Sequence, residues 1–183
     1  VKDNNGCKNT ITGSHNVDAI SPAVITIPVP DDICAGDSLT LSAPTITENG
    51  SNVTDGKWYL GGEVYTRKTA VEYDKNNAIL QYIANSSCGG VVKSNEVKIT
   101  VNSAPSITIN ADGNLPADIC SGQKYQLPSV TVTNNGSGVT SEGWYLGGTQ
   151  ITLDEGKYYT FSVEEDNDKS LVYKAVNGCG ETT

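Results

Sequence analysis

The chain has 183 residues, a formal net charge of −9 and five cysteines. The acidic surplus argues against binding to nucleic acid or to an anionic membrane surface, because both partners require clusters of Lys and Arg. No apolar run approaches the roughly 20 residues of a membrane-spanning helix. Gly, Asn, Thr, Ser and Val are abundant and no segment keeps a helical period, so the sequence predicts an all-β fold.

Residues 1–20 resemble the end of a repeat. Asn5-Gly6-Cys7 matches Asn177-Gly178-Cys179, and residues 14–17 match residues 94–97. We therefore expect residues 1–20 to be the C-terminal strands of a preceding repeat. Because the chain has no Met and no signal peptide, we also expect it to be a piece of a longer protein.

An internal repeat organises the rest of the chain. Trp58-Tyr59-Leu60-Gly61-Gly62 recurs as Trp144-Tyr145-Leu146-Gly147-Gly148, and each copy follows the cysteine of an Ile-Cys-x-Gly sequence by 24 residues. A Tyr and then a Cys follow each copy. This repetition predicts two domains, at residues 21–102 and 103–183.

The first domain is expected to contain six strands, at residues 23–27, 39–41, 57–60, 71–73, 79–84 and 96–101. Residues 48–56 are polar and rich in Gly and Asn, which predicts a loop. Gly61-Gly62 predicts a tight hairpin turn, because a type I′ turn requires a positive φ at both central residues.

The second domain is expected to repeat this plan, with strands at residues 107–109, 125–127, 130–132, 143–146, 158–163 and 171–176. No segment corresponds to residues 96–101, so the predicted sandwich lacks its last strand and has an unpaired edge. Two explanations stay open. Either the parent chain continues, or residues 8–20 of one molecule complete the sandwich of another by strand donation.

The cysteines predict one disulfide within each domain, Cys34–Cys88 and Cys120–Cys179, with Cys7 unpaired. A second pattern stays open, in which Cys7–Cys34 and Cys88–Cys120 join neighbouring repeats and Cys179 is left over. Disulfides in small repeats indicate an oxidising environment outside the cytoplasm. A zinc site is not expected, because the chain has no Cys-x-x-Cys pair and a single histidine, His15.

The sequence contains no catalytic constellation, so neither enzyme activity nor a cofactor is expected. Asp166 and Asp168 are weak candidate calcium ligands in an acidic stretch, although a solvated hairpin explains the same residues. An exposed tyrosine surface for glycan stacking is a further hypothesis, formed by Tyr65, Tyr73, Tyr158 and Tyr159. Four other aromatic residues are expected in the two cores: Trp58, Trp144, Tyr82 and Tyr173.

The order Ile-Cys-x-Gly, Leu-x-Leu, Trp-Tyr-x-Gly-Gly, Tyr and Asn-Gly-Cys resembles the Ig-like repeats of large secreted surface proteins of Bacteroidota. Those proteins include gliding adhesins and substrates of type IX secretion. The resemblance covers nearly the whole chain and implies tandem immunoglobulin-like β-sandwiches. It departs from antibody domains, because the Tyr lies six residues before the second Cys rather than two.

The resemblance implies a non-catalytic stalk segment of an extracellular, cell-surface adhesin, with the neighbouring repeats as its partners. Two alternatives stay open: a module that binds glycans or host surface proteins, and a subunit that assembles by strand donation. The resemblance also implies O-glycosylation at Ser38, because Asp37-Ser38-Leu39 has the Asp-Ser-apolar pattern that Bacteroidota modify. A turn aspartate before a strand explains the same residues.

Overall fold

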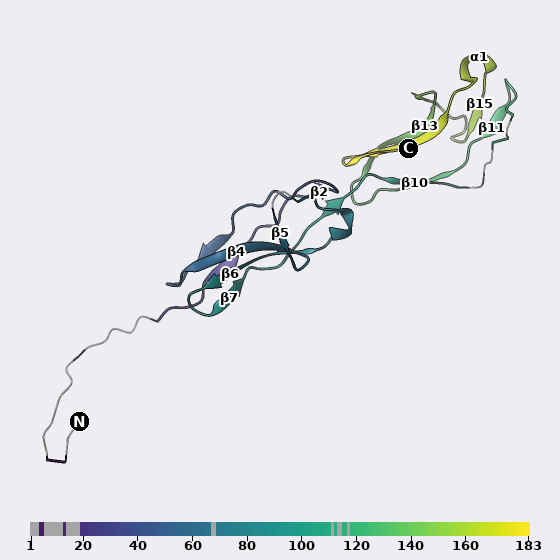
Figure 1. The fold of residues 1–183 in the computed structure, drawn as a ribbon. Coiled ribbons are helices and arrows are strands. Elements are labelled where there is room, and N and C mark those ends of the chain that lie inside the picture. Colours follow the sequence, from purple (N-terminus) through teal and green to yellow (C-terminus); the bar gives the residue numbers. More distant parts are fainter. Residues whose placement is uncertain are drawn as a thin grey trace.

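The computed structural model describes residues 4–5, 13, 19–66, 69–110, 112, 115–116 and 118–183. Two β-sandwiches follow each other end to end along an elongated molecule (Figure 1). The first sandwich contains β1 to β9 and the second contains β10 to β17. This arrangement confirms the predicted all-β class of tandem immunoglobulin-like sandwiches, while the boundaries at residues 21 and 103 stay a prediction.

The main sheet of the first sandwich has the strand order β5-β4-β6-β7, with β8 pairing with another part of β6. Its strands are β4 (Val53–Leu60), β5 (Glu63–Tyr65), β6 (Ile79–Ser86), β7 (Gly90–Lys93) and β8 (Val97–Lys98). The remaining strands form two short pairs, β1 (Val24–Thr26) with β3 (Thr45–Thr47), and β2 (Ile33–Cys34) with β9 (Val101–Asn102). A 3₁₀ helix, η1 (Tyr73–Lys75), precedes β6.

The second sandwich has a main sheet in the order β14-β13-β16-β17. These strands are β13 (Val139–Leu146), β14 (Thr149–Gln150), β16 (Leu171–Asn177) and β17 (Gly180–Thr182). The other pairs are β10 (Ser106–Ile109) with β12 (Val130–Thr133), and β11 (Lys124–Gln126) with β15 (Tyr158–Thr160). A short helix, α1 (Val163–Asp166), follows β15. Within the described ranges, this sandwich has no strand corresponding to β8 or β9.

The same aromatic pair lies at the centre of both main sheets. Trp58 is opposite Tyr82 and Trp144 is opposite Tyr173 in the antiparallel register. The ring centroids are 5.2 Å and 5.3 Å apart in edge-to-face contacts. Such pairs stabilise beyond the apolar area they cover, and here they hold the two long central strands of each sheet in the same register.

The two cores differ in how completely they are closed. Leu80 is fully buried, and it shares its core cluster with Val97, Ile99 and Val101 from the segment that runs from β8 to β9. Its counterpart by register, Leu171, is only half-buried, because the described part of the second sandwich has no strand at that place. The first core is therefore complete on this side and the second is open.

Several predicted elements have different bounds in the structure. The predicted loop at 48–56 is too long, because β4 already begins at Val53. Leu39 and Leu41 are buried as expected but do not form a strand, since the Leu39 amide donates to the Tyr65 hydroxyl (2.9 Å). The predicted strand at 71–73 is wrong, because residues 71–72 form no strand and η1 begins at Tyr73. The predicted strand at 158–163 is too long, because β15 ends at Thr160 before α1.

The predicted hairpin turn is confirmed at both copies of the Gly-Gly pair. Gly61 and Gly62 have φ angles of 60° and 87°, and Gly147 and Gly148 have φ angles of 57° and 85°. Only glycine adopts these conformations without steric cost, so the repeated pair fixes the β4–β5 and β13–β14 hairpins.

The difference between the cores predicts unequal costs for one matched substitution. Leu80→Ala should lower the free energy of unfolding of the first sandwich by about 2–5 kcal/mol, because it leaves a cavity in a closed core. Leu171→Ala should lower that of the second sandwich by less, since its side chain already contacts solvent. Each sandwich contains one tryptophan. Denaturant titrations followed by Trp58 fluorescence in a Trp144→Phe background, and the converse, measure the two separately. Equal losses would contradict the open second core.

Candidate functional site: the junction between the sandwiches

A disulfide joins the two sandwiches. It links Cys34 to Cys179, which are 145 residues apart in sequence, and their Cα atoms are 5.3 Å apart. Cys34 ends β2, which pairs with β9 immediately before the chain enters the second sandwich. Cys179 lies in the turn between β16 and β17. The bond therefore fixes one end of the first sandwich to the facing end of the second.

The predicted pairs Cys34–Cys88 and Cys120–Cys179 are wrong. Cys88 and Cys120 are free thiols, and Cys7 lies outside the described residues. The reason is the place of the two cysteines in the first sandwich. Cys34 lies beside the outgoing strand β9, whereas the Cys88 thiol contacts the carbonyl oxygen of Ile20 (3.5 Å) in the incoming segment. The two cysteines are thus at opposite ends, and the pattern that pairs Cys7 with Cys34 is excluded as well.

The side chain of Asn177 holds the linker against the second sandwich. Its amide nitrogen donates to the carbonyl oxygens of Ser103 (2.7 Å) and Asn134 (3.1 Å). Its amide oxygen accepts a hydrogen bond from the backbone of Cys179 (2.8 Å). Because Asn177 is 5% exposed, water cannot readily replace these bonds. Asn177 therefore couples the orientation of the disulfide turn to the linker.

A second asparagine binds the linker from the opposite loop. The Asn135 amide donates to the carbonyl oxygen of Ala104 (2.8 Å), and the Asn135 carbonyl oxygen accepts from the Ser103 amide (3.2 Å). Asn135 has a φ of 50°, a conformation that Asn adopts more readily than most residues. The following Gly136 lies so close to the side chain of Asn102 that a Cβ there would collide with it. The loop is thus shaped to receive the linker.

The N-terminal end of the first sandwich repeats this clamp. The Asn49 amide donates to the carbonyl oxygen of Pro22 (3.1 Å), and the Asn49 carbonyl oxygen accepts from the Ser21 amide (3.2 Å). Asn49 also has a φ of 50°. By these contacts, Ser21 corresponds to Ser103. Sequence reasoning missed the clamp, although the recurring Asn-Gly-Ser before each Trp was a signal that could have revealed it.

The four tyrosines proposed for glycan stacking do not form one surface. Tyr65 is buried, and its hydroxyl donates to the carbonyl oxygen of Thr69 (3.0 Å), so its assignment to an exposed surface is wrong. Tyr73 is exposed in η1 of the first sandwich. Tyr158 and Tyr159 are half-buried on β15 of the second sandwich. The predicted core residues Trp58 and Trp144 are buried, and Tyr82 and Tyr173 pack half-buried against them.

Two carboxylates of the acidic stretch around α1, those of Asp166 and Asp168, accept hydrogen bonds within the protein. Asp166 accepts hydrogen bonds from the Ser162 amide (2.9 Å) and the Tyr159 hydroxyl (3.3 Å). Burial, together with this carboxylate, raises the pKa of Tyr159. Asp168 accepts a hydrogen bond from the side chain of Asn167 (3.0 Å). Among the described residues, no group of three or more His, Cys, Asp or Glu side chains converges as a metal site would require.

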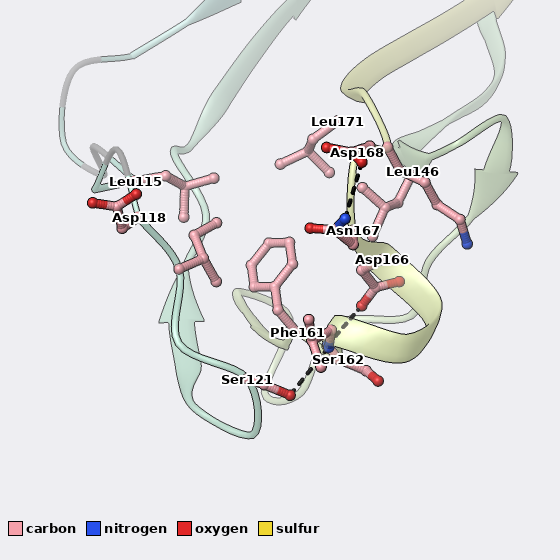
Figure 2. A pocket seen from close by; sticks show the side chains of 13 residues that line it. Leu115, Asp118, Ser121, Leu146, Phe161, Ser162, Asp166, Asn167, Asp168 and Leu171 are labelled. Carbon is pink, nitrogen blue, oxygen red and sulfur yellow. Dashed lines mark hydrogen bonds between the residues drawn. The ribbon is translucent and has the colours of Figure 1, made fainter.

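An open groove in the second sandwich lies beside the free Cys120. It has a volume of about 530 Å³, and Figure 2 shows its side chains. Its lining is mixed. The apolar residues are Leu115, Ile119, Leu146, Phe161, Val163 and Leu171, and the polar and charged residues are Asp118, Ser121, Ser162, Asp166, Asn167, Asp168 and Lys169. By register, Leu146 and Leu171 correspond to Leu60 and Leu80 of the first sandwich, which pack against residues of the last two strands. The groove is therefore the place that β8 and β9 occupy in the first sandwich.

Comparisons with known proteins find distant structural neighbours. Neither a family model nor a curated protein sequence matches the chain. An I-band fragment from titin matches 90% of the chain at 15% identity with a TM-score of 0.45, and the chain covers 64% of that fragment. Tandem Ig repeats of Dlar match 89% of the chain and 93% of their own length, at 14% identity and a TM-score of 0.30. Fibronectin(III)-like modules of Clostridium thermocellum CbhA match 87% and 90%, at 15% identity and a TM-score of 0.33.

The class that fold and junction define is a pair of tandem Ig-like repeats with a disulfide between them. Within the described residues, the helices lack the length and apolar character needed to cross a membrane. The distinguishing feature of this pair is its junction. There a disulfide links the two sandwiches, and the side chains of Asn177 and Asn135 bind the linker between them.

The buried amide of Asn177 predicts a measurable cost at the junction. Asn177→Ala should lower the free energy of unfolding of the second sandwich by about 1–3 kcal/mol, because it leaves buried backbone groups without partners. Asn134→Ala is the matched control, since this side chain is exposed in the same cluster and its removal should change the free energy by less than about 0.5 kcal/mol. Trp144 fluorescence in a Trp58→Phe background measures both. Equal effects would contradict the role assigned to Asn177.

Proposed function

We propose that the chain is a non-catalytic stalk segment that sets the distance and direction between the parts of a longer surface protein. The observation that carries this proposal is the Cys34–Cys179 bond between the two sandwiches. Sandwiches joined by a flexible linker move relative to each other by default. Here the linker residues 103–105 accept or donate hydrogen bonds to the second sandwich, and the disulfide adds a covalent second connection beside the linker. Two connections resist bending far better than one.

The proposed setting is extracellular, on a bacterial cell surface. A disulfide that joins two domains persists only where the environment is oxidising. The net charge of −9 favours solubility and repulsion between neighbouring stalks. The likeness of the Trp-Tyr-x-Gly-Gly repeats to those of Bacteroidota surface proteins supports an adhesin-like parent, in which other domains hold the ligand. Neighbouring repeats are the partners proposed for this segment.

Removing the inter-sandwich disulfide should loosen the pair without unfolding either sandwich. In small-angle X-ray scattering, the Cys34→Ser/Cys179→Ser variant should show bent conformations and a smaller mean radius of gyration. The Cys88→Ser/Cys120→Ser variant, which removes two free thiols, is the matched control and should scatter like the parent chain. The bond also closes a 145-residue loop, so its loss should cost up to about 5 kcal/mol of unfolding free energy on the chain-entropy model. Identical scattering of the two variants would contradict the stalk role.

The proposed modification at Ser38 has an accessible target. Ser38 is exposed and follows the turn in which the Asp37 amide donates to the carbonyl oxygen of Cys34 (3.0 Å). We expect a hexose-bearing peptide around Ser38 in native material, read by mass spectrometry, and its loss in Ser38→Ala. Thr40→Ala, an exposed neighbour that lies outside the Asp-Ser-Leu pattern, should leave the glycopeptide intact. An unmodified Ser38 in native material would contradict the assignment.

A further inference from the structure

We propose that Cys120 of one copy of the chain forms a disulfide with Cys88 of a second copy placed head to tail. This bond would be equivalent to the Cys34–Cys179 bond between the two sandwiches of one chain. The inference rests on the proposed stalk function and extends it to assembly. Both thiols are free in the single chain. Each has a counterpart that is already bonded, because the first and second sandwiches carry equivalent cysteines at equivalent ends.

Cys88 occupies in the first sandwich the position that Cys179 occupies in the second. Ser86 and Asn177 stand two residues before these cysteines, and each accepts a hydrogen bond from the cysteine amide, at 3.4 Å and 2.8 Å. The following glycines both face the incoming segment. A Cβ at Gly89 would lie 2.9 Å from Pro22, and one at Gly180 would lie 3.5 Å from Ala104. Cys88 is thus positioned beside the incoming chain as Cys179 is.

Cys120 occupies in the second sandwich the position that Cys34 occupies in the first. The carbonyl oxygen of Cys34 accepts from the Asp37 amide (3.0 Å), and that of Cys120 accepts from the Gln123 amide (3.2 Å). The Gly36 and Gly122 amides donate to equivalent carbonyl oxygens, those of Val71 (2.9 Å) and Phe161 (2.8 Å). Cys120 is exposed. Cys120 is therefore an unbonded equivalent of Cys34, available for a disulfide with a cysteine equivalent to Cys179.

The groove beside Cys120 supplies an independent reason for a second copy. In the first sandwich this space holds Ile99 and Val101, and β9 pairs in parallel with β2 beside Cys34. The equivalent contacts of Ser21 and Ser103 replace the earlier match of residues 14–17 with residues 94–97. Counted back along the sequence from Ser21 without a gap, Ala19 takes the position of Val101 and Val17 that of Ile99. These apolar residues alternate as a strand that covers a core requires. In sequence, the N-terminal segment of a second copy therefore supplies apolar residues for the groove drawn in Figure 2. Ile20, at the end of this segment, contacts the Cys88 thiol of the same copy.

Closing the bond requires an oxidant, for which we name glutathione disulfide. The thiolate of Cys120 attacks one sulfur of glutathione disulfide, which forms a mixed disulfide and releases one reduced glutathione. The thiolate of Cys88 from the second copy then attacks the protein sulfur of that mixed disulfide and releases the second glutathione. In total, two protein thiols are oxidised to one disulfide and one glutathione disulfide is reduced to two thiols. The two protons that leave the protein thiols are taken up by the two departing glutathione thiolates, so no net proton is released.

The test uses the full chain with Cys7→Ser, which removes the one cysteine outside the described residues. Incubated at high concentration with glutathione disulfide, this chain should form a ladder of covalent multimers on non-reducing gels. Peptide mass spectrometry should find Cys88–Cys120 as the dominant intermolecular link, with Cys34–Cys179 unchanged. Dominant Cys88–Cys88 or Cys120–Cys120 links, or the absence of any link while Cys34–Cys179 is intact, would overturn the proposal.

Two variants sharpen the result. Added to the Cys7→Ser chain, Cys88→Ser and Cys120→Ser should each abolish the ladder, whereas an equimolar mixture of the two should form dimers that grow no further. Val17→Asp should slow the linkage by about tenfold, since its carboxylate would be placed against the apolar side chains of the groove and would repel the aspartates that also line it, Asp118, Asp166 and Asp168. An unchanged rate would contradict the proposed binding of the N-terminal segment in the groove. The scattering comparison of the Cys34→Ser/Cys179→Ser variant with its control tests the stalk role separately. If that variant bends as expected while no head-to-tail link forms, the stalk role stands and the assembly proposal alone is wrong.

Discussion

The bond between Cys34 and Cys179 is the constraint on which the architecture depends. It forms because β2 pairs with β9, which brings Cys34 to the point where the chain leaves the first sandwich. The clamp of Asn177 and Asn135 then sets the direction in which the linker enters the second sandwich. The disulfide joins both sandwiches, whereas the clamp joins the linker to the second sandwich. Together they connect two small domains, each with a limited core, at more than one point.

Such a junction suits a task in which shape matters more than chemistry. Small sandwiches present loops at their two ends, and in this chain the facing ends are occupied by structural contacts rather than by an open cleft. The acidic residues that suggested a metal site satisfy the backbone of α1 through Asp166. The hydroxyl of Tyr65, one of the tyrosines proposed for glycan stacking, accepts from the Leu39 amide and donates to the Thr69 carbonyl oxygen. Residue types typical of binding sites thus serve the fold.

The sequence predicted what depends on local pattern and failed where the answer depends on which ends of the domains meet. Periodicity and turn chemistry predict the core positions of Trp58 and Trp144, the Gly61-Gly62 turn and the all-β class. The partner of Cys34 does not, because two cysteines in one repeat can lie near each other or at opposite ends of the sandwich. The path of β2 beside β9 decides between these outcomes, and that pairing joins residues 68 apart, Ile33 with Val101. Propensity carries no information about such a contact.

The positions of the cysteines also make the two ends of each sandwich different. One cysteine of each sandwich lies at its incoming end and the other at its outgoing end, so two joined sandwiches use one of each and leave one of each free. A contact between unlike ends is heterologous, and its repetition produces an open linear array wherever the rotation between copies does not close a ring. In the proposed array, the segment that covers the second core is also the segment that enters the next copy, so completing the core and adding a copy are one event.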